Sequence, residues 1–60
     1  MNTLRAARVE DIEWLIAAGE HPDRIATRTG YANLDNLTVQ LSRWGRRDLV
    51  TRLRSARDAA

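Results

Sequence analysis

Polar side chains suited to base recognition recur between residues 34 and 44. Asn36 and Gln40 carry amides, and Arg43 carries a guanidinium group. An amide of this kind can pair with the N6 and N7 groups of adenine, and a guanidinium with O6 and N7 of guanine. Val39 lies between them and offers a surface that could pack on the methyl group of thymine. These four residues predict contacts with base edges in DNA. The alternative is a merely solvated polar face, with Val39 a tolerated surface residue.

An amphipathic helix over residues 34–44 would present these side chains together. Its apolar positions recur at i, i+3, i+7 and i+10: Leu34, Leu37, Leu41 and Trp44. The opposite face then carries Asp35, Asn36, Val39, Gln40, Ser42 and Arg43. Asn33 is a good N-cap for this helix, and Asp35 in the first turn complements the helix dipole. Gly45 is expected to end it.

A short helix and a sharp turn precede this segment. Pro22 follows His21 and suits a first helical position, and the helix should end near Thr29. Ala26 supplies a small side chain where two helices approach closely, and Gly30 can take the positive φ of a tight helix exit. A short helix, a glycine turn and an amphipathic second helix form the layout of a helix-turn-helix, whose second helix can enter the major groove.

Two further helices complete the expected fold, an all-α bundle of three to four helices containing the helix-turn-helix. The first should carry a core face of Val9, Ile12, Leu15 and Ile16, and end at Gly19. We place its acidic residues in its first turn, complementing the dipole: Glu10, Asp11 and Glu13. The last helix should begin at residue 46 or 47 and bury Leu49, Val50 and Leu53. We expect residues 1–8 to be an arm or an early start of the first helix, residues 9–54 the domain, and residues 55–60 a frayed tail.

The composition limits what else this chain does. Sixty residues without cysteine allow one small core and no thiolate metal site. No apolar stretch is long enough for a signal peptide or a membrane span, so we expect a cytoplasmic protein with no membrane partner. The single histidine, His21, precedes a proline, where N-capping or solvation is expected. We therefore expect no enzyme activity, cofactor, metal or small-molecule ligand.

Charge is distributed unevenly along the chain. Residues 1–30 carry four arginines against five acidic residues, and residues 31–60 carry six against three. A basic second half suits a phosphate-facing surface, although it also suits simple solubility. Five residues around the two expected helices are candidate phosphate contacts: Arg28, Thr29, Tyr31, Arg46 and Arg47. Arg5 and Arg8 would form either a minor-groove arm or a disordered basic tail, of which the tail is favoured.

The segment Ile25-Ala26-x3-Gly30-Tyr31-x5-Leu37 resembles the second DNA-binding element of AraC-type regulators. The continuation from Leu41 to Leu49 is similar to small helix-turn-helix proteins of actinobacteria and their phages. The resemblance implies a helix-turn-helix that binds DNA. Because Asn36 stands where the commonest turn spacing has an apolar residue, either the turn or the first part of the second helix is expected to be one residue longer. No sensor domain accompanies the motif, so effector control is not implied.

Two functions follow as hypotheses. The first is a DNA-binding transcriptional regulator of phage or plasmid type, which inserts the helix over residues 34–44 into double-stranded DNA. The alternative is a protein-interaction module of the same fold, which binds a host protein such as RNA polymerase or a repressor. Trp14 would be its contact residue if it is exposed rather than a lid on the core. A homodimer could form through Trp14, or through Leu49 and Leu53 of the last helix.

Overall fold

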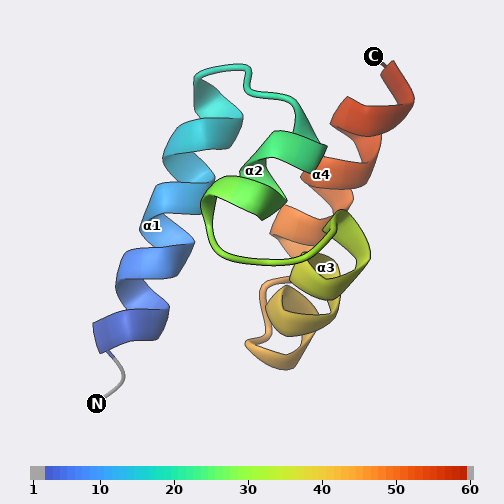
Figure 1. Ribbon diagram of the computed structural model, residues 1–60. Helices are drawn as coiled ribbons and strands as arrows, with labels where there is room; N and C mark the ends of the chain where they lie inside the picture. The colour runs from blue at the N-terminus through green and yellow to red at the C-terminus, as the bar shows by residue number, and fades with distance from the viewer. Residues whose placement is uncertain (1–2, 60) are drawn as a thin grey trace.

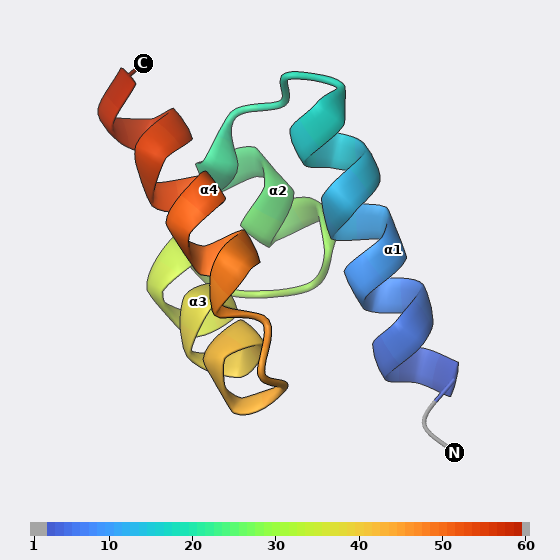
Figure 2. The same cartoon turned by 180° about the vertical axis from the view of Figure 1, so that it is seen from behind.

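The computed structural model describes residues 3–59, which form four helices and no strand. These are α1 (Thr3–Ala17), α2 (Pro22–Arg28), α3 (Leu34–Arg43) and α4 (Arg47–Ala59). The prediction of an all-helical fold is therefore confirmed for this part of the chain. The helices α1 and α3 each pack against both α2 and α4, so the short α2 lies in the middle of the molecule (Figures 1 and 2). Within residues 3–59 no helix combines the length and the apolar character needed to cross a membrane.

The core lies where the four apolar faces meet. Six aliphatic side chains are almost fully buried: Ile12, Ile25, Leu37, Leu41, Leu49 and Leu53. Val9, Leu15, Ala26, Leu34 and Val50 complete this core, and Ile16, Tyr31 and Trp44 pack against it while half-buried. The predicted apolar faces are thus confirmed. Thr38 is also buried, and its hydroxyl donates to the carbonyl oxygen of Asp35, one turn earlier in α3.

The first helix is longer than its apolar pattern predicts. It begins at Thr3, so residues 3–8 are an early start of α1 rather than an arm. The prediction that the three acidic residues occupy its first turn is wrong, because Glu10, Asp11 and Glu13 lie in its second half. Their charges therefore do not complement the dipole at the helix N-terminus. Residues 1–2 of the predicted arm lie outside the described residues.

The last helix is also longer than expected. It continues to Ala59, with residues 54–59 helical and exposed, so the frayed tail predicted over residues 55–60 is wrong as far as Ala59. Ala60 lies outside the described residues. Leu53 is the last buried residue of α4. The last turn carries Arg57, whose charge complements the C-terminal end of the helix dipole.

The first three helices end in the same backbone motif, in which two backbone N–H groups reach back into the last turn. After α2, the N–H of Gly30 donates to the carbonyl of Thr27 and that of Tyr31 to the carbonyl of Ala26. This is the Schellman pattern, and it requires a positive φ at its glycine. Gly30 has φ of +92°, as the prediction of a glycine exit requires. The exits of α1 and α3 repeat the pattern around Gly19 and Gly45.

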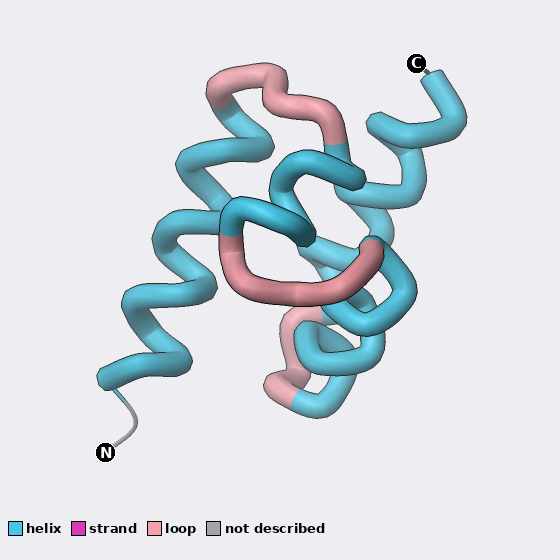
Figure 3. Tube along the Cα trace, in the orientation of Figure 1, coloured by secondary structure: helices cyan, strands magenta, loops and turns pink. Residues whose placement is uncertain are grey.

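The loop of residues 29–33 leads from this exit to α3, passing across the front of the molecule in Figure 3. Asn33 closes it as the predicted N-cap, because its side-chain oxygen accepts from the backbone N–H of Asn36 at 2.8 Å. His21 caps α2 in the same way, with Nδ1 accepting from the N–H of Asp23 at 3.1 Å. Both side chains satisfy N–H groups that the helices leave without a partner.

We predict that Asn33→Ala lowers the free energy of unfolding by about 1 kcal/mol, because the first turn of α3 loses its cap. Asn33→Ser is the matched control, since serine supplies an equivalent acceptor and should retain most of the stability. Urea denaturation followed by circular dichroism measures both. Equal losses in the two variants would show that the side-chain oxygen does not stabilise α3.

Candidate nucleic-acid interface

The outward face of α3 carries the four predicted base-contacting residues. Asn36 and Arg43 are exposed, Gln40 is half-buried, and Val39 is 51% exposed. The opposite face of α3 is committed to the core through Leu34, Leu37 and Leu41. The helix is therefore divided into a buried side and a side open to a ligand.

The polar groups on this face are not used by the fold. Within residues 3–59, the side chains of Asn36, Gln40 and Arg43 make no hydrogen bond or ion pair. Asp35 lies in the first turn of α3, as predicted, where a carboxylate complements the helix dipole. Two amides and a guanidinium thus remain available on one helix face, with the apolar Val39 among them.

The prediction that Thr29 contacts a phosphate is not supported by the position of its side chain. Its side chain is buried, and the hydroxyl donates to the carbonyl oxygens of Ile25 at 2.7 Å and Ala26 at 3.2 Å. This hydroxyl stabilises the end of α2 and is not presented to a phosphate. Nothing in the sequence distinguishes these two roles, because the hydroxyl of a threonine at a helix exit can face solvent or bond to its own backbone.

Arg8 reaches across to the same turn from α1. Its guanidinium donates to the carbonyl oxygen of Thr29 and lies 5.6 Å from the ring centroid of Tyr31, within cation–π range. We call this the Arg8 clamp. Both predictions for Arg8, a minor-groove arm and a disordered tail, are therefore wrong, because Arg8 lies in α1 and contacts the turn. The contact also holds Tyr31 behind the turn. Arg5 also lies on α1, in its exposed first turns.

Arg28 is held by an ion pair at the end of α2. Its Nη1 atom lies 2.9 Å from Oε2 of Glu20, and its side chain remains 59% exposed. A hydrogen bond from the backbone N–H of His21 lowers the pKa of the Glu20 carboxyl, and Arg28 acts in the same direction. Arg28 therefore keeps solvent-facing N–H groups although one side of it is paired.

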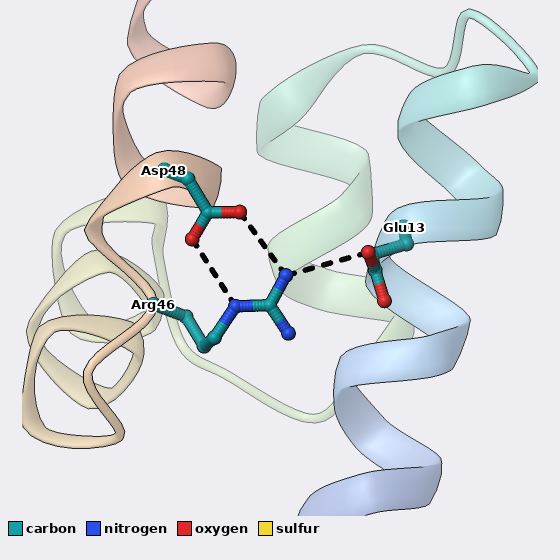
Figure 4. A network of polar contacts seen from close by, with 3 residues as sticks. All are labelled: Glu13, Arg46 and Asp48. Atoms are coloured by element: carbon teal, nitrogen blue, oxygen red, sulfur yellow. Dashed lines mark hydrogen bonds and ion pairs between the residues drawn. The ribbon is translucent and has the colours of Figure 1, made fainter.

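Of the two arginines that follow α3, Arg46 belongs to the fold. It makes two hydrogen bonds of 3.1 Å to the carboxylate of Asp48 and one of 3.4 Å to Glu13 of α1 (Figure 4). These carboxylates raise the pKa of Arg46, and Arg46 lowers the pKa of Asp48. The guanidinium is thus committed to joining the start of α4 to α1. Arg47 is exposed and makes no side-chain contact of this kind within residues 3–59.

The structure also settles the position of Trp14. Its side chain is 68% exposed, which excludes a role as a lid over the core. Leu49 and Leu53 are fully buried, so the apolar face of α4 is not available to a second copy of the chain. Of the two dimer interfaces that the sequence allowed, only the one on α1 has an exposed apolar side chain.

Within residues 3–59 no group of three or more histidine, cysteine or acidic side chains is arranged to hold a metal ion. Comparisons with models of protein families, with curated proteins and with solved structures give no match to this chain.

Proposed function

We propose that this protein binds double-stranded DNA by placing α3 in the major groove. The observation that carries the proposal is the outward face of α3, on which two amides, a guanidinium and a valine lie together without hydrogen-bond or ion-pair partners among residues 3–59. Arginine, asparagine and glutamine are the side chains that pair with guanine and adenine through two hydrogen bonds at once. We further propose that α2, the turn and α3 act as a helix-turn-helix, and that the protein is a small transcriptional regulator of phage or plasmid type.

The spacing of the four residues suits a base-contacting helix. Asn36, Val39, Gln40 and Arg43 stand at i, i+3, i+4 and i+7, which places them within about 100° of one another around the helix. They extend over about 10 Å along its axis, at 1.5 Å per residue. Successive base pairs rise by about 3.4 Å, so the face is long enough to meet three of them. A short site of this kind gives modest specificity from a single copy.

Phosphate contacts would come from cations near the ends of this face. Arg47 is the first residue of α4 and has no side-chain partner among residues 3–59, and Arg28 retains exposed N–H groups at the end of α2. Tyr31 is half-buried as part of the Arg8 clamp, and its hydroxyl is a candidate contact. We leave Thr29 and Arg46 out of the proposed interface, because the fold already uses their polar groups.

The exposed Trp14 favours the second candidate function, a protein-interaction module that does not bind DNA. The two functions predict opposite results in one experiment. If the protein binds DNA, micromolar protein at low salt should retard a DNA duplex of random sequence in a gel. No retardation would contradict DNA binding and support the second.

We predict that Arg43→Ala and Arg47→Ala weaken DNA binding in different ways. On a sequence selected from a random library, Arg43→Ala should cost about 1–3 kcal/mol and relax the preference for a guanine. Arg47→Ala should weaken binding to all sequences and reduce the slope of log K against log salt by about 1. Fluorescence anisotropy over a salt series measures both.

Arg57→Ala is the matched control for these two variants. It removes the same charge from the last turn of α4, which lies at the far end of that helix from α3 (Figure 1). We expect it to change affinity much less than either test variant. If all three variants gave the same small, salt-independent change, the assignment of α3 as the recognition helix would be wrong.

A further inference from the structure

The side chain of Arg8 is held in place without a carboxylate. Its Nη1 atom donates to the carbonyl oxygen of Thr29, and its guanidinium lies 5.6 Å from the ring centroid of Tyr31. Arg28 and Arg46, by contrast, are each paired with the carboxylate of an acidic side chain. A carbonyl oxygen and an aromatic ring orient a guanidinium but carry no net charge to neutralise it. Arg8 therefore places an uncompensated positive charge at a defined position beside the turn.

Most of the hydrogen-bonding capacity of Arg8 is not used by the fold. A guanidinium carries five N–H donors, and within residues 3–59 the side chain makes one hydrogen bond, to Thr29. Asp11 lies one turn further along α1, but no acidic group of residues 3–59 forms an ion pair with Arg8. Arg8 is half-buried, so part of it remains open to solvent. A cation in this state has both the charge and the free donors to bind an anion.

The position of Arg8 relates this charge to the DNA interface proposed above. The turn that Arg8 contacts begins beside α1 and leads into α3, as Figures 1 and 2 show. Thr29, whose carbonyl Arg8 binds, lies in the chain between Arg28 and Tyr31, which are both candidate phosphate contacts. The anion that this position favours is therefore a phosphate of the DNA backbone.

We propose that Arg8 binds a backbone phosphate of DNA beside the turn between α2 and α3. This inference rests on the proposed function and adds to it a contact from α1, a helix that does not pack against α3. Because the Arg8 clamp orients the guanidinium before DNA is bound, little side-chain freedom is lost when the contact forms. A phosphate contact carries no sequence information, but it fixes the orientation of the protein on the duplex and adds to the salt dependence of binding.

The salt dependence of DNA binding, measured by fluorescence anisotropy, tests this contact. Arg8→Gln removes the charge and should reduce the slope of log K against log salt by about 1, which weakens binding about eightfold at about 0.1 M salt and hardly at all near 1 M. Arg8→Lys keeps the charge and should keep the slope. Arg57→Gln removes the same charge from the last turn of α4 and is the matched control, with little expected change in slope. A residue that acted only through the fold would weaken binding equally at every salt concentration.

Neutral phosphates in the DNA identify the group that Arg8 contacts. In a duplex of the selected sequence, single phosphates are replaced in turn by uncharged methylphosphonates. One replacement should weaken binding of the unaltered chain but weaken binding of Arg8→Gln much less, because that variant has already lost the contact. Arg8→Met, which keeps an unbranched side chain against Tyr31, is a second neutral variant and should behave like Arg8→Gln. Circular dichroism confirms that each variant remains helical.

The outcomes separate this inference from the proposed function. If the unaltered chain binds no duplex, the proposed function is wrong and the inference fails with it. If the chain binds DNA but the neutral variants at residue 8 keep its salt slope, the inference alone is overturned. A slope that falls as much in Arg8→Lys as in Arg8→Gln would also overturn it, as would a scan in which no methylphosphonate distinguishes the unaltered chain from the neutral variants.

Discussion

Replacing Leu37 by alanine is expected to remove about 2–5 kcal/mol from the free energy of unfolding. Leu37 is fully buried at the centre of α3, where it faces the core. A domain of 60 residues has a total stability of roughly 3–9 kcal/mol, so this loss is a large fraction of it. The variant should be largely unfolded at moderate temperature. Circular dichroism during thermal and urea denaturation measures the effect.

Val39→Ala is the matched control on the opposite face of the same helix. Val39 is 51% exposed, so its truncation leaves no internal cavity and should change stability by no more than about 0.5 kcal/mol. The comparison separates the buried side of α3 from the side available to DNA. Similar denaturation midpoints for the two variants would contradict the orientation of α3 described above.

Gly30→Val is expected to lower the free energy of unfolding by about 3 kcal/mol. A β-branched residue rarely adopts a positive φ such as the +92° of Gly30. Backbone strain at such a position costs up to about 3 kcal/mol. The substitution also crowds the Arg8 clamp, because a Cβ atom at this position would lie 3.4 Å from Nη1 of Arg8. Both effects act on the turn that leads into α3. Urea denaturation gives the loss of stability.

Gly19→Val separates these two effects. Gly19 has a similar φ of +81° in the same exit motif, but a Cβ atom there would have no atom within 4 Å among its surroundings. We expect a smaller loss for Gly19→Val, and we expect Arg8→Ala to reduce the difference between the two glycine variants. Equal losses at both glycines, unchanged by Arg8→Ala, would mean that the clamp does not constrain the turn.

The sequence predicts best those features that are encoded within one or two helical turns. The cap at Asn33 and the exit at Gly30 each depend on residues no more than five positions away, and both are confirmed. The buried face of α3 follows from the spacing of its leucines in the same way. The assignment of base-contacting residues also comes from this local pattern and stays a prediction.

Features that depend on the tertiary arrangement could not be predicted from the sequence. Arg8 contacts Thr29, which is 21 residues away, through a backbone carbonyl that leaves no signature in the sequence. The sequence predicts a phosphate contact at Arg46, because it does not reveal that Arg46 pairs with Glu13, which is 33 positions away. The sequence does not distinguish an early start of α1 from an arm, because residues 3–7 are all exposed and show no apolar period.

The Schellman motifs at the ends of α1, α2 and α3 have a consequence for how the chain folds. Each motif lies within six consecutive residues, so the signal that ends each of the three helices is local and does not depend on contact with another helix. The contacts that form on folding are also mostly close in sequence. Helical domains of this kind fold in microseconds to milliseconds. The core can thus be covered soon after the last helix leaves the ribosome, which shortens the time in which its leucines are exposed to aggregation.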